Sequence, residues 1–168
     1  MKKLNIFLSV LIAFSLNGQE NIKYQKPSDE ILDLVEFERP PSVQYDDDKN
    51  YMVFLYRDNY KSISDLSEKE LRLGGLRINP KTNIGSRVTF YNNVKIKKLK
   101  NKNSSAEQVS GLPDNPKLTN FAWSPDETKI ALTNTTENGV ELWVLDLETA
   151  SVVKLTEAIL NANIGGVI

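Results

Sequence analysis

The clearest pattern of apolar and polar positions lies in residues 118–156, where four short apolar runs are separated by three turn signals. Alternation of apolar and polar residues is typical of a strand with one buried face. The three turn signals are Ser124-Pro125-Asp126-Glu127, Asn138-Gly139 and residues 146–150. The pattern predicts a four-stranded antiparallel meander of about 40 residues, the size of one propeller blade.

Two of these turns have a specific physical basis. Pro125 favours the φ value required at the second position of a type I turn, and the Asp126 carboxylate can accept hydrogen bonds from nearby backbone N–H groups. Asn-Gly tolerates the positive φ that a two-residue hairpin requires at both central positions. We therefore expect Asn138 and Gly139 to form the centre of the second turn.

These strand and turn residues resemble the blade motif of TolB-type propellers and of the prolyl-oligopeptidase family. The motif reads Phe-x-Trp-Ser-Pro-Asp-x-x-x-Ile-Ala from Phe121, followed by Leu-Trp-Val-Leu-Asp-Leu from Leu142. Glu127 stands where the motif usually has glycine. The resemblance implies an all-β fold, a complete or partial β-propeller built from antiparallel four-stranded blades.

A second copy of the pattern begins at residue 42. Tyr45 aligns with Trp123, Asp48 with Asp126 and Met52 with Ile130, each pair 78 positions apart (123 minus 45). This offset is nearly twice a blade of roughly 40 residues, so either another blade lies between the copies or the first blade carries an insertion. We favour an insertion at residues 58–93, because residues 58–73 read as helical turns capped by Ser67 and ended by Gly74-Gly75.

A chain of 168 residues corresponds to about one domain. We predict a signal peptide (1–18), a lead-in with a short helix (19–41), a first blade (42–113), a second blade (114–157) and the start of a third (158–168). Within the first blade, further strands are expected at residues 94–100 and 107–112. Ser28 should cap the lead-in helix, and its apolar face should comprise Ile31, Leu32, Leu34 and Val35.

The N-terminus has the features of an export signal. Lys2 and Lys3 precede an apolar run over residues 4–16, and Gly18 is a suitable small residue at the cleavage site. The alternative, a retained membrane anchor, is disfavoured because a span needs about 20 apolar residues. We expect a periplasmic or secreted bacterial protein that is free of the membrane after cleavage.

Removal of residues 1–18 takes away two lysines and no acids, so the formal net charge of −1 becomes −3. This mildly acidic balance predicts no binding to nucleic acid. The chain contains no cysteine, which excludes disulfides and a thiolate nucleophile.

Irregular segments extend the resemblance beyond the blade motif. Pro40-Pro41-Ser42-Val43, residues 71–83 and the pattern Leu-Thr-x-x-x-Leu-Asn-Ala from Leu155 are similar to the N-terminal part of bacterial prolyl-oligopeptidase-family serine peptidases, closest to the glutamyl-endopeptidase branch. The similarity covers most of residues 24–164. It implies a propeller that gates an active site and selects peptide substrates, with the hydrolase domain following it.

The residues that such chemistry requires are missing from this sequence. It contains no histidine and no Gly-x-Ser-x-Gly motif, whereas a serine triad needs an imidazole as general base. We therefore expect a non-catalytic chain with no catalytic, cofactor-binding or metal-binding residues, which meets a peptide substrate only within a full-length enzyme. The alternative is a stand-alone TolB-like periplasmic module that binds a protein or peptide partner.

Several groups of residues have a possible functional role and a simpler structural one. Asp46-Asp47-Asp48 could hold calcium, but a solvated hairpin turn is favoured. A basic segment could bind an anionic polymer, although a solvent-facing edge strand is favoured. It comprises Lys95, Lys97, Lys98, Lys100 and Lys102. For Arg57, Arg72, Arg77 and Arg87, surface pairing is favoured over binding of an acidic side chain, and Trp123 and Trp143 are expected in the core.

The apolar strand before residue 147 presents two faces, and both need partners. Val140, Leu142 and Val144 lie on one face, and Trp143, Leu145 and Leu147 on the other. An uncovered face of this kind favours association. Because the chain cannot cover these blade faces itself, we expect the chain alone to be marginally stable, to self-associate through them, or to be partly molten.

Overall fold

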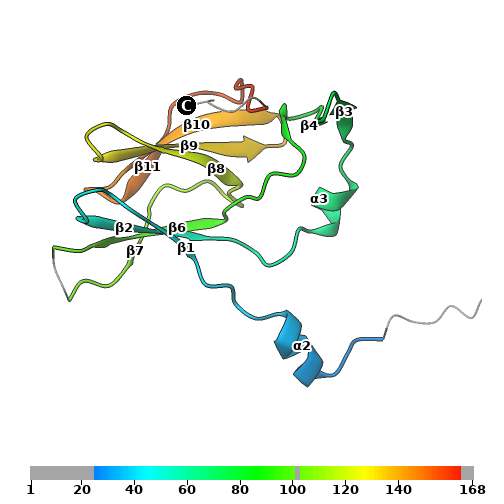
Figure 1. Ribbon diagram of the computed structural model, residues 1–168, viewed down its shortest axis with the longest axis horizontal. Coiled ribbons are helices and arrows are strands. Elements are labelled where there is room, and N and C mark those ends of the chain that lie inside the picture. The colour runs from blue at the N-terminus through cyan, green and yellow to red at the C-terminus, as the bar shows by residue number, and fades with distance from the viewer. Residues whose placement is uncertain (1–24, 101–102, 164–168) are drawn as a thin grey trace, which may run out of the picture. The chain divides into compact units, whose positions relative to one another are not determined.

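The computed structural model describes residues 25–100 and 103–163 (Figure 1). The chain divides into two compact units, Met1–Glu36 and Phe37–Ile168. The signal peptide predicted for residues 1–18 lies outside the described residues. Within the described ranges, no helix has both the length and the apolar character that a membrane span requires.

The described part of the first unit contains one helix, α2 (Asp29–Val35). Ser28 occupies the N-cap position, but its side chain makes no capping hydrogen bond, contrary to the prediction. None of the helix residues is buried, and Ile31 and Leu34 are 54% and 78% exposed. The side chains of the predicted apolar face are therefore not buried in this helix.

The second unit contains two four-stranded antiparallel sheets. In the first sheet the order is β1-β2-β6-β7, formed by β1 (Ser42–Tyr45), β2 (Tyr51–Tyr56), β6 (Asn93–Lys98) and β7 (Glu107–Gln108). In the second sheet the order is β11-β10-β9-β8, formed by β8 (Leu118–Trp123), β9 (Lys129–Thr136), β10 (Gly139–Asp146) and β11 (Ser151–Lys154). The meander predicted for residues 118–156 and the mostly antiparallel all-β character are confirmed, although β7 is shorter than predicted.

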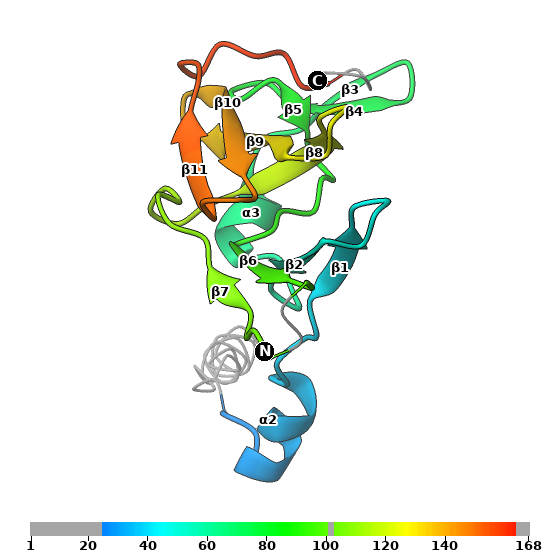
Figure 2. The same cartoon turned by 90° about the vertical axis from the view of Figure 1, so that its left-hand side faces the viewer.

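The two sheets face each other across one hydrophobic core (Figures 1 and 2). The first sheet contributes Val53, Leu55, Val94 and Ile96, and the second contributes Leu118, Ile130, Leu132 and Leu145. All eight side chains are at most 1% exposed. Burial of large aliphatic side chains on both sides is the main force that holds the sheets together.

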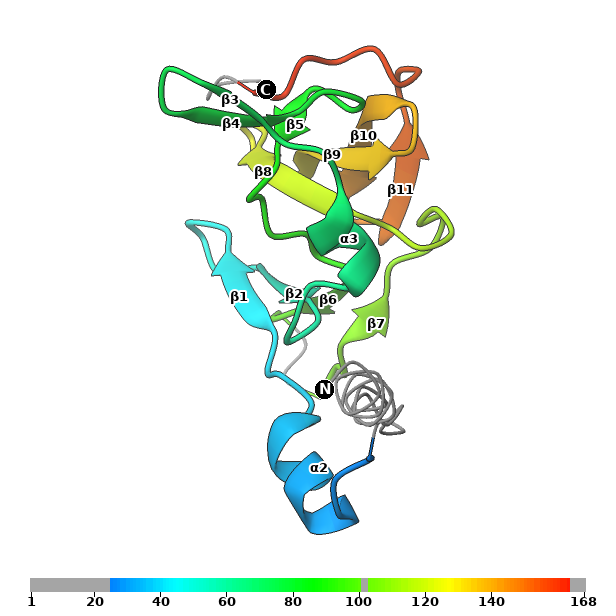
Figure 3. The same ribbon diagram turned by 90° about the vertical axis from the view of Figure 1, so that its right-hand side faces the viewer.

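Residues between β2 and β6 form a helix and a small third sheet (Figure 3). The elements are α3 (Ile63–Ser67), β3 (Leu71–Leu73), β4 (Leu76–Asn79) and β5 (Ile84–Gly85). We call this segment the insertion.

The predicted cap and extent of the helix in the insertion were wrong. The side chain of Ser62, not that of Ser67, accepts the capping hydrogen bond, from the backbone N–H of Asp65. Leu71–Leu73 is a strand because Gly74-Gly75 forms a hairpin turn with positive φ that pairs it with β4. The pairing of the two strands across this tight turn overrides local helix propensity.

The register of the β9–β10 hairpin also differs from the expectation. Thr136 pairs with Gly139, so Glu137 and Asn138 are the central residues of the turn. Gly139 follows the turn with a φ of 148°, and a Cβ there would lie 2.6 Å from the carbonyl oxygen of Ala158. The glycine is therefore required by close packing against the C-terminal segment.

That C-terminal segment runs beside β10 and then reaches β5. The backbone N–H of Leu160 donates to the carbonyl oxygen of Val140 at 3.0 Å, and that of Ala162 donates to Asn83 at 3.0 Å. Residues 158–163 thus connect the second sheet to the insertion.

Candidate functional site

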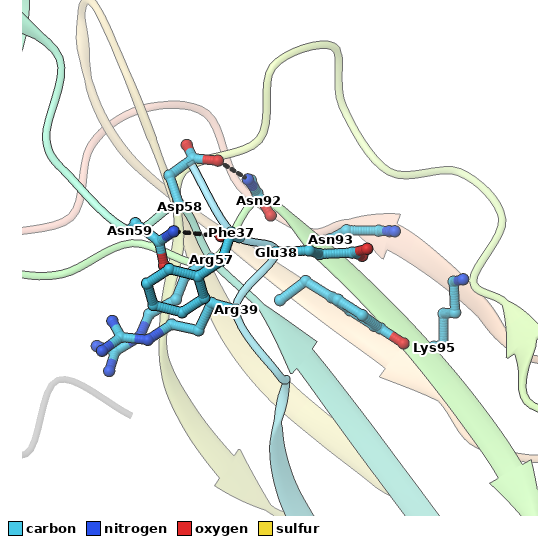
Figure 4. A pocket seen from close by; sticks show the side chains of 10 residues that line it. Phe37, Glu38, Arg39, Arg57, Asp58, Asn59, Asn92, Asn93 and Lys95 are labelled. Carbon is cyan, nitrogen blue, oxygen red and sulfur yellow. Dashed lines mark hydrogen bonds between the residues drawn. The ribbon is translucent and has the colours of Figure 1, made fainter. Parts of the chain in front are cut away.

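A pocket of about 350 Å³ opens where β2 ends and β6 begins (Figure 4). Phe37, Glu38 and Arg39 form one wall before β1 starts. The remaining lining residues are Tyr56, Arg57, Asp58, Asn59, Asn92, Asn93 and Lys95. We call it the arginine pocket.

Hydrogen bonds fix the backbone around this pocket. Asn92 Nδ2 donates to Asp58 Oδ1 at 2.7 Å, and the Asn92 backbone N–H donates to the Tyr56 carbonyl at 2.8 Å. Asn59 Nδ2 donates to the Phe37 carbonyl, while Asn59 Oδ1 is buried and has no partner among the described residues. The hydrogen bonds that hold the walls therefore do not involve the side chains of Arg39 and Arg57.

Arg39 and Arg57 are the chemically distinctive groups of the pocket. Both are half-buried, and neither makes an ion pair or hydrogen bond with any residue that the structure describes. Their side chains extend toward the same end of the view below the Phe37 ring (Figure 4). Two unpaired guanidinium groups provide planar forks of N–H donors that suit a carboxylate or another oxyanion.

A larger groove of about 1,880 Å³ continues from the arginine pocket and shares both arginines with it. The insertion forms one side, and residues at the ends of β9 and β10 line another part. Lys117 Nζ bonds to Asp65 Oδ1 at 2.7 Å and tethers α3 to the start of β8. Several of the charged residues that line the groove are therefore already paired with each other.

Glu70 is the centre of one such group. It accepts hydrogen bonds from Ser86 Oγ at 2.5 Å, Arg72 Nε at 2.8 Å and Arg77 Nη1 at 2.9 Å. The Ser86 hydroxyl, followed by the Arg72 guanidinium, lowers the pKa of Glu70 from 4.5 to about 2. Arg72 and Arg77 thus show the internal pairing that the sequence favoured, which distinguishes them from Arg57.

A buried carboxylate that the sequence did not reveal lies on β10. Glu141 is 9% exposed and accepts hydrogen bonds from Trp143 Nε1 at 2.9 Å and from Asn134 Nδ2 at 3.2 Å. Lys154 Nζ lies 3.5 Å from its other oxygen. Trp143, like Trp123, is half-buried at the rim of the core rather than fully inside it.

Asp46-Asp47-Asp48 forms a turn, but the turn is not solvated throughout. Asp46 is 3% exposed and accepts hydrogen bonds from the backbone N–H groups of Asn50 at 2.9 Å and Tyr51 at 2.6 Å. No group of three or more potential metal ligands occurs among the residues that the structure places. The Asp46 carboxylate therefore closes a turn and is committed to the backbone.

The lysine-rich strand β6 lies inside its sheet, between β2 and β7, so the predicted edge position was wrong. Lys95 Nζ lies 5.3 Å from the centre of the Tyr56 ring, and Lys98 Nζ donates to the Glu148 carbonyl at 2.6 Å. Lys100 is exposed in the following turn, and Lys102 lies outside the described residues. Lys95 and Lys98 therefore make different contacts, from opposite faces of the strand.

Two plant proteins are similar to this chain, and both are named "Probable glutamyl endopeptidase, chloroplastic". The protein from Oryza sativa subsp. japonica is 29% identical over 150 residues, which cover 83% of this chain and 16% of the relative. The protein from Arabidopsis thaliana is 31% identical over 133 residues, which cover 75% of this chain and 14% of the relative. The chain is a distant homologue of named glutamyl endopeptidases.

That homology extends over most of the chain, but the chain spans only about one sixth of the length of the curated relatives it matches. No family model matches the chain. No solved structure matches it either.

The sequence singled out one of the two arginines but favoured another role for it. Arg57 was expected to make a surface pair rather than to bind an acidic side chain, and that expectation was wrong, because Arg57 has no partner among the described residues. Arg39 was missed, although it directly precedes Pro40-Pro41, which favours an extended path into β1. Glu141 and Asn134 were also missed, because a single acid in an apolar strand carries no signal of its partners. The arginine pocket was therefore recognisable only once β2 and the segment before β1 lay side by side.

Proposed function

We propose that this chain is the non-catalytic N-terminal part of an exported serine peptidase, and that it helps to select peptide substrates. Its two four-stranded sheets would be the first blades of a propeller that gates the active site. The single observation that carries the proposal is the homology of this chain to about one sixth of the length of two proteins that are named as peptidases. The lack of histidine in the sequence agrees with a supporting rather than a catalytic role.

The arginine pocket provides a chemical reason for peptide selection. Arg39 and Arg57 are half-buried and have no acidic partner among the described residues. Their guanidinium groups can therefore donate hydrogen bonds to a carboxylate without first breaking an internal ion pair. Asn59 Oδ1, also unpartnered among the described residues, can accept a hydrogen bond from a peptide N–H. We therefore propose that the pocket binds the acidic side chain of a peptide.

The test compares binding of two short peptides that differ by Glu or Gln at one position. The full chain should bind the Glu peptide more tightly in calorimetry, and Arg39→Gln and Arg57→Gln should each reduce this preference about tenfold or more, as expected for loss of a charged hydrogen-bonding partner. Arg87→Gln is the matched control, because Arg87 is exposed and does not line the arginine pocket. Equal binding of both peptides by the unmodified chain would refute acidic-peptide selection.

The non-catalytic role requires a separate measurement. The chain should not hydrolyse chromogenic peptides that contain Glu or Pro. Turnover that a serine-directed inhibitor abolishes would contradict the proposal, since it would require a nucleophile and base that we do not assign.

The second candidate function is a stand-alone TolB-like periplasmic module that binds a protein or peptide partner. The motif from Phe121 to Ala131 favours it, because TolB-type propellers share that motif. The sequence of the gene downstream of Ile168 separates the two proposals. Further strand repeats followed by Gly-x-Ser-x-Gly support the peptidase, whereas a stop codon without a neighbouring hydrolase gene supports the module.

A further inference from the structure

The arginine pocket lies at one end of the larger groove. Arg39 and Arg57 line both, and from them the groove extends along the insertion to residues at the ends of β9 and β10. The residues that line the pocket alone are Phe37, Glu38, Tyr56 and Lys95. Lys95 lies on the side of the view opposite the two arginine side chains (Figure 4). A peptide that follows the groove would therefore reach one of its ends at this pocket.

Both arginine charges in this pocket are unbalanced. The lining contains two acids, of which Asp58 accepts a hydrogen bond from Asn92 Nδ2 at 2.7 Å and Glu38 is exposed. Among the described residues, neither acid forms an ion pair with Arg39 or Arg57. Like charges that line one half-buried pocket repel each other. A ligand with two carboxylates would balance both arginines, whereas a ligand with one carboxylate would leave a positive charge over.

A third cation of the pocket is already engaged with a neighbour. Lys95 Nζ lies 5.3 Å from the centre of the Tyr56 ring, a distance at which an ammonium group is attracted to the face of an aromatic ring. The two guanidinium groups are therefore the cations that await a partner.

The last residue of a peptide that ends in Glu or Asp presents the groups that match this pocket. It carries two carboxylates, one on its side chain and one at the chain end, together with one backbone N–H. The pocket offers two guanidinium forks that each suit a carboxylate. It also offers Asn59 Oδ1, a buried acceptor with no partner among the described residues. An acidic residue in the middle of a peptide supplies only one carboxylate.

We propose that the arginine pocket binds the carboxy-terminal residue of a peptide that ends in Glu or Asp, with its two carboxylates on Arg39 and Arg57. This inference rests on the acidic-peptide binding proposed above and adds the position of the acid in the peptide. The preceding residues of the peptide lie in the groove, on the side of the insertion. The protein therefore distinguishes a peptide that ends in an acidic residue from one that contains the same residue elsewhere.

The test uses short alanine peptides that differ in one feature each, with calorimetry on the full chain. A peptide that ends in Glu should bind about tenfold or more tightly than the same peptide with an amidated C-terminus, as expected for one charged hydrogen-bonding partner. It should exceed by a similar factor the isomer that has Glu at its first position. This isomer is the matched control, because its composition and net charge are the same.

Arginine variants test whether both guanidinium groups take part. Arg39→Gln and Arg57→Gln should each weaken binding of the Glu-ending peptide about tenfold or more, and the double variant should bind its free acid and its amide equally. Arg87→Gln should keep the full preference, because Arg87 is exposed and does not line the arginine pocket. If a Gln variant unfolds in circular dichroism, Arg39→Lys and Arg57→Lys retain the charge without the planar fork and should still weaken the preference for the free acid.

The carboxy-terminal inference and the proposed function fail in different ways. Equal binding of the free acid and the amide, with Glu still preferred to Gln in both, would overturn the inference and leave acidic-side-chain binding in place. Equal binding of the two isomers would also overturn it, because the affinity would then follow net charge alone. Equal binding of Glu and Gln peptides in both the free-acid and the amide series would refute acidic-side-chain binding itself.

Discussion

Lys49 and Glu127 occupy the same position of the same turn in the two sheets. They are 78 residues apart, both have left-handed backbone conformations with φ of 56° and 53°, and each backbone N–H donates to the carbonyl three residues earlier. The left-handed region is costly for residues other than glycine. Glu127 stands at the position where the motif that this segment resembles has glycine, and its φ explains that preference.

Replacing Lys49 with glycine should therefore stabilise the protein. The substitution relieves the left-handed strain of about 1–2 kcal/mol, partly offset by the greater freedom of glycine in the unfolded chain, so we expect a net gain of about 0.5–1 kcal/mol. Urea unfolding followed by circular dichroism measures it. Asp48→Gly in the same turn is the control and should destabilise, because Asp48 does not have a positive φ.

Removing the Asp46 carboxylate should destabilise the first sheet. Asp46→Ala leaves the backbone N–H groups of Asn50 and Tyr51 without their acceptor, at a cost of about 1–3 kcal/mol. Asp46→Ser should cost less, because Ser124 holds the equivalent place in the second sheet and its Oγ accepts from the Lys129 N–H at 3.0 Å. Equal losses for the two variants would show that the hydrogen bonds contribute nothing.

Asp46 should also make stability depend on pH. Burial raises the pKa of Asp46, but the hydrogen bonds from Tyr51 and Asn50 outweigh it, so the pKa lies below its ordinary value of 3.8. The stabilisation is therefore complete above that ordinary value and is lost as the pH falls through the lower folded value. Unfolding free energies of the unmodified chain and of Asp46→Ser should converge as the pH falls from about 5 to about 2; a constant difference would contradict this.

Gly139→Ala should disturb the C-terminal segment. The added methyl group would meet the Ala158 carbonyl in a backbone conformation that suits glycine, and we expect a loss of about 2–4 kcal/mol. Hydrogen exchange at the Leu160 N–H, which bonds to Val140, should become faster. Gly74→Ala is the control: it has a positive φ but no atom within 4 Å of the new methyl group, so it should cost about 1 kcal/mol and leave that exchange unchanged.

Glu141 should contribute to the stability of the fold more through its hydrogen bonds than through its charge. Glu141→Ala leaves the Trp143 indole N–H and the Asn134 amide without their acceptor, and we expect a loss of about 1–3 kcal/mol. Glu141→Gln keeps an acceptor and loses the contact with Lys154, which should cost at most about 1 kcal/mol. Thermal unfolding followed by indole fluorescence compares them; a larger loss for Gln than for Ala would assign the effect to charge.

The sequence by itself determined the features that depend on neighbouring residues. Alternation at Phe121 and Trp123 specified a strand, and Ser124-Pro125-Asp126-Glu127 specified the turn after it. The Asp126 carboxylate accepts the Thr128 N–H at 3.3 Å, as predicted. The repeat offset was also readable, since Tyr45 and Trp123 hold equivalent places in paired strands. These features follow from local sterics and from the two-residue period of a strand.

Only the tertiary structure decided the features that depend on distant partners. β6 is an interior strand because β7 adds to its far side. Asp46, rather than Asp48, is the buried turn acceptor, because the backbone N–H groups of the following strand point at it. Arg39 and Arg57 line the same pocket because the segment before β1 passes the end of β2. Local propensity carries no information about such contacts, since pairing and burial between distant segments determine them.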